Sequence, residues 1–316
     1  MIPVIGFLGG RTGTGTTTFV YHLAWLYAEQ GYRVLVADLD PQPNLSVRML
    51  DEERLMKLWA HLPPAADADP SDRELLDLVR EPIAPNLELL VGDPALVMEE
   101  DLLARSWQTC HTGSPLAFHE TFSVQRRVHA AARAAQADVV LIDLASMPSA
   151  LNRAALLACQ FMIALVAPDL LSIHELIAWL PRIEEWRADW ADMRATHEVA
   201  RQGPEALATS AGYIVREQPV RVGRSSLDWS TTIATAYAHA SRRAEDEVDH
   251  LGTLKWYGSV LPMAEEARKP LFHLKPADGA LGAHAKVVRE FRNNFERIAQ
   301  RIADTTWKRD DPARAR

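Results

Sequence analysis

The N-terminal part of the chain contains the pattern that most restricts how it can fold. A short apolar run from Val4 to Leu8 ends in glycines and leads into Thr17 to Gln30, where apolar residues recur at helical spacing. Gly31 then stands where a helix C-cap glycine would, and Arg33 to Leu39 is a second run rich in Val and Leu. A strand, a glycine-containing loop, a helix and a strand in this order predict a βαβ unit and therefore a parallel sheet.

Further apolar runs of strand length alternate with helical segments along the chain. Such continuous runs suit strands that are buried on both faces of a sheet. The predicted strands are 87–91, 139–144, 161–167 and 212–215, with 259–261 as a weaker candidate, and the predicted helices are 125–135, 149–159 and 283–302. The pattern predicts an α/β fold, a doubly wound and mainly parallel sheet flanked by helices.

No linker divides the chain cleanly, so residues 1–309 are expected to form a single domain. Hydrophobic residues make up 48% of the sequence and charged residues 24%, which are ordinary values for a globular protein with a sizeable core. Three stretches break the rhythm of strands and helices and are expected to be loop insertions, near 61–71, 106–115 and 198–211. Residues 310–316 are expected to be a disordered tail.

The composition argues against several classes of protein. The longest apolar run, 161–167, is far shorter than the roughly 20 residues that span a bilayer, so we expect no membrane span. The N-terminus lacks the basic and apolar pattern of a signal peptide, and Cys110 and Cys159 have no metal-ligand or redox spacing. These features favour the cytoplasm. The net charge of −8 argues against avid nucleic-acid binding.

The loop after the first strand is rich in glycine and threonine. Glycines between a strand and a helix let backbone N–H groups face an anion, and the helix N-terminus adds a positive dipole end. A standard phosphate loop has a lysine directly before the Thr that ligates Mg²⁺; here Thr17 is the candidate ligand and Thr16 replaces the lysine. By itself the loop also fits a plain strand-to-helix turn. Its sequence is Gly9-Gly10-Arg11-Thr12-Gly13-Thr14-Gly15-Thr16-Thr17-Thr18.

Together with two other motifs, this loop resembles the ParA/MinD partitioning ATPases. Residues Arg11 to Thr18 fall, position for position, on that family's deviant Walker A motif, Lys-Gly-Gly-x-Gly-Lys-Thr-Thr. The stretch from Asp38 to Asn44 is similar to the family's Asp-x-Asp-Pro-Gln-x-Asn motif, and Val139 to Asp143 resembles its Walker B strand. Residues 165–169 and 261–270 resemble later family segments. The resemblance covers about the whole chain, with the three insertions as extras.

The resemblance implies ATP and Mg²⁺ as cofactors and assigns roles to individual residues. Residues Gly10 to Thr18 would hold the nucleotide, with Pro262 and Met263 near the adenine. Thr17 would ligate Mg²⁺, Asp38 and Asp143 would support the metal, and Asp40 would orient the attacking water. The alternative for Asp40 is a turn residue before Pro41, which an Asp-Pro pair favours.

Arg11 stands where the family has the signature lysine that reaches the partner's nucleotide across a homodimer. Arginine can still donate to a phosphate, although its planar fork does not substitute for a lysine. We therefore take Arg11 and Asp40 as the candidate catalytic residues. Because Thr16 is neutral, ATP hydrolysis is expected to be slow or absent, and whether the chain is an enzyme stays open.

Two interpretations of function remain at this point. The first is a nucleotide-gated dimeric switch that positions DNA or cargo, with a ParB-like protein as a possible partner. The second is a pseudo-ATPase that acts as a scaffold or regulatory subunit of a larger assembly. The motif from Asp38 to Asn44 favours the first, and Thr16 favours the second. The MinD-like protein of bacterial cellulose secretion has a similar pattern, Arg-Gly-Gly-x-Gly-Thr-Thr-Thr, so the replacement of the lysine can mark nucleotide binding that serves a structural role.

Positive charge gathers near the C-terminus, which together with the family habit suggests weak, sequence-independent DNA binding. From Lys255 to Arg301, nine Lys and Arg residues stand against five Asp and Glu residues. The alternative is that these residues form ordinary solvated helix faces. The candidate DNA-binding residues are Arg268, Lys269, Lys286, Arg289 and Arg292.

Overall fold

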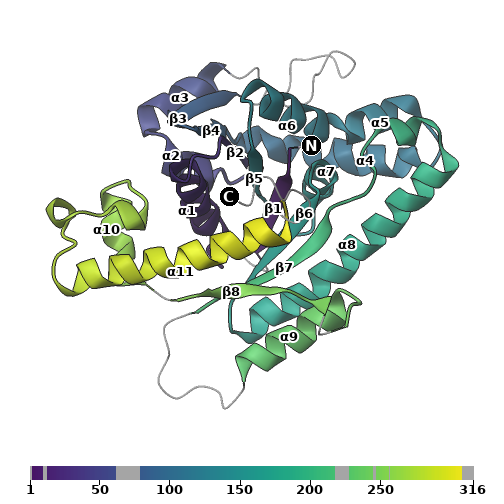
Figure 1. The fold of residues 1–316 in the computed structure, drawn as a ribbon. Helices are drawn as coiled ribbons and strands as arrows, with labels where there is room; N and C mark the ends of the chain where they lie inside the picture. The colour runs from purple at the N-terminus through teal and green to yellow at the C-terminus, as the bar shows by residue number, and fades with distance from the viewer. Residues whose placement is uncertain are drawn as a thin grey trace.

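A mainly parallel sheet forms the centre of the molecule (Figure 1). The computed structural model describes residues 2–9, 13–61, 79–217, 228–244, 247–255 and 257–307. Within these residues the sheet has eight strands in the order β3-β4-β2-β5-β1-β6-β7-β8, and only the β3–β4 pair is antiparallel. This confirms the predicted fold class. The strands are β1 (Val4–Gly9), β2 (Val34–Asp38), β3 (Arg80–Ala84), β4 (Leu87–Leu90), β5 (Val139–Asp143), β6 (Phe161–Val166), β7 (Thr209–Arg216) and β8 (His250–Leu254).

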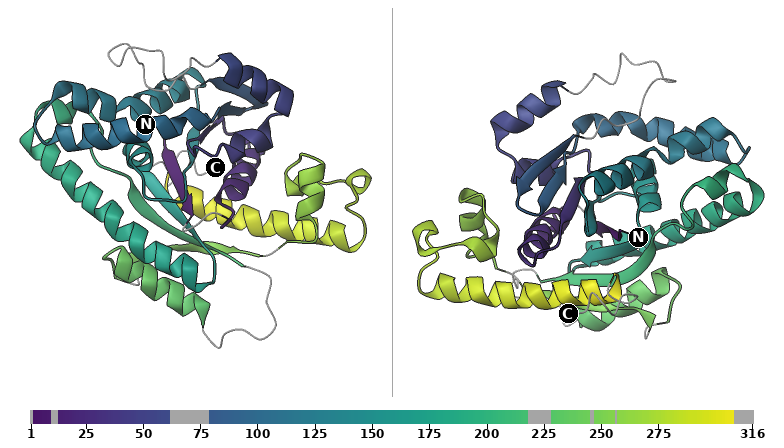
Figure 2. Two further views of the ribbon diagram at one scale, coloured as in Figure 1. Left: turned by 180° about the vertical axis from the view of Figure 1, so that it is seen from behind. Right: turned by 45° about the horizontal axis from the view of Figure 1, so that its top comes forward.

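Helices cover both faces of the sheet and give a three-layer architecture (Figure 2). Successive side chains of β1 enter opposite cores, with Ile5 and Phe7 on one side and Val4 and Leu8 on the other. The first side is covered by α1 (Thr16–Glu29), α2 (Asn44–Met49), α3 (Glu52–His61), α10 (Leu261–Glu266) and α11 (Ala283–Thr305). The second is covered by α4 (Glu100–Cys110), α5 (Pro115–Thr121), α6 (Ser123–Ala134), α7 (Ala150–Ala158), α8 (Leu170–Thr196) and α9 (Trp229–Ala240). None of the helices in these ranges is long and apolar enough to cross a membrane.

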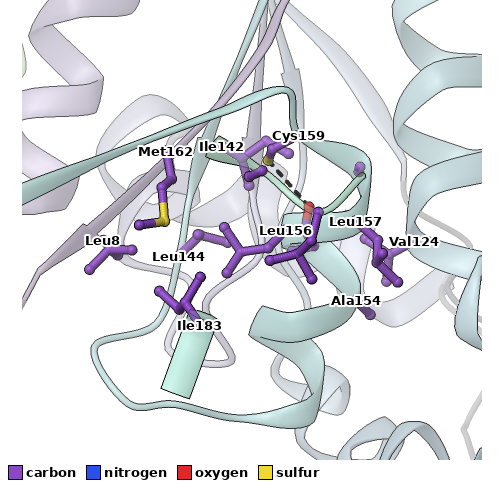
Figure 3. Close-up of a cluster of buried hydrophobic side chains, with 14 of the residues drawn as sticks. Leu8, Val124, Ile142, Leu144, Ala154, Leu156, Leu157, Cys159, Met162 and Ile183 are labelled. Atoms are coloured by element: carbon purple, nitrogen blue, oxygen red, sulfur yellow. Dashed lines mark hydrogen bonds between the residues drawn. The ribbon is translucent and has the colours of Figure 1, made fainter. Parts of the chain in front are cut away.

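Close packing on the second face depends on a glycine in β1. A Cβ on Gly6 would lie 3.1 Å from Leu144 Cδ1 and 3.2 Å from Cys159 Sγ. The Cys159 thiol, in the core cluster of Figure 3, donates to the Ala155 carbonyl at 3.2 Å. Burial raises the pKa of the Cys110 thiol to about 11 and raises that of Cys159 further. Both cysteines are therefore packing residues rather than reactive thiols.

Two edge strands were not predicted, and one predicted strand is wrong. Residues 259–261 form a turn and the start of α10, where Pro262 occupies the first helical turn as proline prefers. The eighth strand is instead β8, which is half-exposed and includes His250 and Gly252. The antiparallel strand β3 has no buried residue and contains Arg80 and Glu81. Neither segment has the apolar run by which the buried strands were recognised.

The predicted insertions have different outcomes. Most of 61–71 and all of 310–316 lie outside the described residues. The segment 106–115 is not the expected loop, because α4 continues to Cys110 and α5 begins at Pro115. Trp107 and Cys110 are buried on α4, although polar residues separate them in the sequence. Within 198–211 a short 3₁₀ helix (Val199–Gln202) precedes the start of β7.

His22 joins helix α1 to the segment that follows α10. Its Nε2 accepts a hydrogen bond from the Leu271 N–H at 3.0 Å, so the ring proton is on Nδ1, which donates to the Thr18 carbonyl at 2.7 Å. The ring is 2% exposed and packs against Phe291 and Phe295. Burial lowers the pKa of His22 to about 4, so the folded protein keeps this side chain neutral.

We predict that His22 makes the protein less stable in mild acid. Between the unfolded pKa of about 6.5 and the folded pKa of about 4, the unfolded chain binds a proton that the folded chain does not, so stability falls as the pH falls. The contribution is about 2 kcal/mol between pH 7 and pH 5. Denaturant unfolding at both pH values should show a smaller pH dependence in His22→Leu than in wild type. The exposed His111, changed to Leu, is the control; equal pH dependence in wild type and His22→Leu would contradict the assignment.

Candidate functional site

The predicted motifs meet at one edge of the sheet, where β1, β2 and β5 end. These strands are parallel neighbours, so their carboxyl ends lie together. Asp38 on β2 is paired in register with Asp143 on β5, and Phe7 on β1 is paired with Asp143 as well. The loop from β1 to α1 begins at the same edge. The fold therefore brings the described part of the glycine-rich loop together with both motif aspartates.

The loop gives α1 an N-terminus that is open to an anion. Gly13 and Gly15 have φ angles of +89° and +84°, in the left-handed region that glycine tolerates best. Gly15 is the N-cap residue, no side chain caps the helix among the described residues, and its first turn contains no acidic residue. The orphan N–H groups of a helix start attract negative charge. Gly10, Arg11 and Thr12 lie outside the described residues, so their assigned roles stay predictions.

Thr16 lies under the loop, against β1. Its side-chain oxygen is 3.2 Å from the Thr14 hydroxyl oxygen, and the residue is only 8% exposed. A Cβ on Gly9 would lie 2.5 Å from the Thr16 oxygen, so the two threonines fill the space beside that glycine. Thr17 and Thr18 are half-buried and line the cleft above the loop. Thr16 therefore presents no charge to a ligand.

Asp38 is held by a short hydrogen-bond chain that the sequence alone did not reveal. Its Oδ2 accepts from both the backbone N–H and the hydroxyl of Ser46, each at 2.8 Å. The Ser46 hydroxyl oxygen accepts in turn from the Gly92 N–H at 2.8 Å. A Cβ on Gly92 would lie 2.8 Å from Asp38 Cγ, so this position has no room for a side chain. Ser46 and Gly92 thus orient the Asp38 carboxylate.

The facing carboxyl groups of Asp38 and Asp143 have oxygens whose hydrogen-bonding capacity the described residues do not satisfy. Asp38 and Asp143 are 0% and 1% exposed. Within the described part of the chain, Oδ1 of Asp38 and both carboxylate oxygens of Asp143 are buried without a hydrogen-bond partner. Such oxygens are costly to bury unless a cation or donor meets them.

Burial shifts the pKa values of all three motif aspartates upward. It raises the pKa of Asp38 to about 7, although the hydrogen bonds from Ser46 lower it. Burial raises the pKa of Asp143 well above its usual range, and the charge of Asp38 raises it further. The nearby Thr17 hydroxyl lowers it, although it makes no hydrogen bond of normal geometry to either Asp143 oxygen. Burial also raises the pKa of Asp40, whose Oδ1 accepts from the Gln42 N–H at 2.9 Å. A cation at this edge would favour the charged forms.

The donor set fits Mg²⁺ only with help from a ligand. Among the described residues, no group of three or more His, Cys, Asp and Glu side chains is placed to hold a metal. Mg²⁺ commonly keeps several waters and binds one or two carboxylates plus phosphate oxygens. The half-buried Thr17 and the partnerless oxygens of Asp38 and Asp143 suit that mode, since they supply charge and a hydroxyl but not a complete shell.

A cleft of about 860 Å³ opens above the loop, which is within the range of small-molecule sites. A second, smaller recess of about 40 Å³ lies on the other side of Gly15 and is lined by Thr18, Arg216, Tyr257 and Phe291, among others. Pro262 and Met263 are in α10 but line neither space; Leu261 lines the recess, and Ala264 and Glu265 line the cleft. The cleft lining also includes Gly13, Thr17, Asp40, Arg48, Met147, Arg268 and Lys269.

The structure divides the candidate DNA-binding residues between two places. Arg268 and Lys269 are at the rim of the cleft, whereas the other three are on α11. Four of the five form ion pairs with carboxylates: Arg268 with Glu52, Lys269 with Asp278, Lys286 with Glu290, and Arg292 with Glu29 and Glu296. Lys286 and Arg289 are exposed. The five residues are thus not one concentrated basic surface.

The sheet order and this edge define the chain as a member of the P-loop NTPase fold class. A family model described as an AAA domain matches residues 2–192. The chain therefore belongs to this family, and its fold is that of the ParA/MinD-type P-loop proteins.

Known proteins agree with this assignment. A curated protein of Rhizobium rhizogenes named replication protein A is 29% identical over 180 residues, 57% of this chain and 43% of that protein. The match thus spans less than half of the relative's length. Protein DIP2308 of Corynebacterium diphtheriae has a similar fold, with a TM-score of 0.68, 19% identity and coverage of 98% and 100% of the two chains. The cell division ATPase MinD of Pyrococcus furiosus follows at a TM-score of 0.57, 18% identity and coverage of 96% and 99%.

We predict that the carboxylate pair destabilises the ligand-free protein. Asp143→Asn removes one of two facing buried carboxyl groups, which are costly to ionise together, and supplies an amide donor, so it should raise the melting temperature at pH 8 by about 3 °C or more. Asp192→Asn, at an exposed position of α8, is the matched control and should leave the melting temperature unchanged. Scanning calorimetry without nucleotide or divalent cation makes the comparison. A lower melting temperature for Asp143→Asn would show that the carboxylate is already satisfied.

Proposed function

We propose that this protein binds ATP with Mg²⁺ and acts as a nucleotide-gated dimeric switch in the positioning of DNA or another cargo, with weak or lost hydrolysis. One observation carries the proposal: an uncapped, glycine-bounded helix N-terminus lies beside buried carboxylates whose oxygens lack partners. An anionic group and a cation are needed at adjacent points, and a nucleotide phosphate chain with Mg²⁺ supplies both.

The residues of the site would each have a part in binding the nucleotide and the metal. The N–H groups at the start of α1 receive the phosphates, and Thr17 offers its hydroxyl to the metal. Asp38, oriented by Ser46, and Asp143 would supply negative charge to the metal. Asp40 is more accessible than these two and lines the cleft, so it can orient a water for attack on the terminal phosphate.

The surroundings of the cleft favour a second copy of the chain as the partner of this face. Val47, Val97 and Met147 line the cleft and are 47%, 58% and 69% exposed. They follow β2, β4 and β5, so apolar surface gathers around the site where the phosphates would lie. Exposed apolar groups clustered in this way often mark an interface. Closure of this face by a homodimer would cover both the apolar groups and the nucleotides.

Thr16 sets the expected rate of hydrolysis. It turns towards Thr14 and leaves the terminal phosphates without the cation that P-loop enzymes place there. We infer slow or absent turnover, so that binding and release of nucleotide, rather than rapid hydrolysis, would control the switch. The same observation favours the second candidate, a pseudo-ATPase that serves as a scaffold or regulatory subunit of a protein assembly.

We predict that Thr16→Lys increases ATP turnover by about 10²–10³-fold, since it restores a cation to the phosphates. The gain should disappear when Asp40→Ala is added. Phosphate release with Mg²⁺ and ATP gives the rates, and nucleotide affinity is measured in parallel. Thr196→Lys, an exposed threonine at the end of α8, controls for added charge. Wild-type turnover at an ordinary enzymatic rate that Asp40→Ala leaves intact would contradict the proposal.

We also predict that Mg²⁺ and ATP shift the protein from monomer to dimer, and that Arg11→Ala weakens the shift. By the family resemblance, Arg11 would cross to the partner's phosphates and supply charge that Thr16 lacks. Sedimentation of wild type and variant, each with and without Mg²⁺ and ATP, measures the dimer fraction. Arg133→Ala, on an exposed face of α6, is the control. If nucleotide leaves the wild type monomeric, the scaffold interpretation is preferred.

Cargo and compartment stay at the level of proposals. The charge pairing of Arg268, Lys269, Lys286 and Arg292 leaves less free positive charge for DNA than the sequence suggests. A ParB-like protein or an assembly subunit is the alternative partner. Activity in the cytoplasm fits ATP as a ligand and two buried, unpaired cysteines.

A further inference from the structure

We propose that Arg216 is a second source of positive charge for the phosphate loop, and that it selects nucleotides with two or three phosphates. The inference rests on the proposed function, because it names a residue that strengthens the same nucleotide site. Arg216 belongs to none of the three motifs that the sequence identified. It is the last residue of β7, two strands away from β1 in the sheet.

The geometry places the guanidinium directly against the loop. Nη1 of Arg216 donates to the Gly13 carbonyl at 2.9 Å. Its Cζ and Nη1 lie 3.0 Å from the point where a Cβ on Gly15 would be. Gly15 is the residue that caps α1, so the charge of Arg216 adjoins the start of the helix that faces the phosphates. The absence of a side chain at Gly15 makes this approach possible.

Two sources of positive charge meet at this point of the loop. The N-terminal end of α1 carries a partial positive charge, and its first turn has no acidic residue to offset a nearby cation. Arginine stays protonated in proteins, so Arg216 brings a full positive charge to this point even though burial lowers its pKa. A phosphate chain on the loop would make both charges favourable. The arrangement therefore suits an anionic ligand on the loop.

Arg216 also compensates for the missing lysine in a different way from Arg11. Thr16 contributes no charge, and Arg11 would act on the partner's nucleotide. Arg216 acts within the same subunit, from the side of the loop that faces β7. It forms a hydrogen bond with the loop backbone and does not replace a side chain within the loop. It is thus a positioning residue whose charge supports the phosphates at short range.

The test compares ATP, ADP and AMP binding by titration calorimetry in wild type and Arg216→Gln. Glutamine can still donate to the Gly13 carbonyl, so this variant removes the charge while keeping a donor. Arg216→Lys restores a charge. The matched control is Arg243→Gln, because Arg243 donates to the Ser210 carbonyl at 3.2 Å, at the opposite end of β7. Melting temperatures confirm that each variant is folded.

We expect Arg216→Gln to weaken ATP and ADP binding about tenfold or more, with a much smaller effect on AMP. Arg216→Lys should recover part of the affinity, Arg243→Gln should match wild type, and adding Thr16→Lys to Arg216→Gln should restore ATP binding. If the wild type binds ATP, equal losses of affinity for ATP and AMP in Arg216→Gln, or no loss, would overturn the role proposed for Arg216 and leave the proposed function standing. A wild type that binds none of the three nucleotides would overturn the proposed function as well.

Discussion

The apposition of Asp38 and Asp143 is the constraint on which the site depends. Parallel pairing of β2 with β5 puts two buried carboxylates in register, and the cost of that arrangement is offset only by a cation or by protonation. Nothing in the packing of the sheet demands acidic residues there, since apolar residues would fill the same space at lower cost. The strands therefore hold a site that is strained when empty and relieved when a cation is bound.

The sequence predicted the central architecture because the buried strands and the first helix have strong local signals. Val4–Leu8, Arg33–Leu39 and Val139–Leu144 are rich in apolar residues, and their order alone implies parallel strands. The edges carry no such signal: β3 is charged and β8 contains His250 and Gly252, so both depend on pairing with a neighbour. The late segment 259–261 has the composition of a strand but lies where the chain turns into α10.

The site was predicted in its motifs but not in its supporting contacts. Asp38, Asp40 and Asp143 follow strands and so meet at one edge, as their places in the sequence imply. Ser46 follows Asp38 by 8 residues, Gly92 follows Ser46 by 46, and Arg216 follows Gly13 by 203. A sequence gives no distance between such residues. The sequence offered one signal. Arg216 ends β7 and Gly92 comes shortly after β4, and the carboxyl ends of both strands lie at this edge of the sheet.

The distribution of charge around the loop links the carboxylate pair with Arg216: carboxyl oxygens without partners lie on one side of the loop, and a guanidinium lies on the other.

The most direct test is a crystal structure of the protein with Mg²⁺ and a non-hydrolysable ATP analogue. The account predicts the phosphates over Gly13 to Thr18, the metal beside Thr17 and facing Asp38 and Asp143, and the Arg216 guanidinium on the outer side of the same loop. Nucleotide bound elsewhere, or a loop without phosphates at saturating analogue, would contradict it.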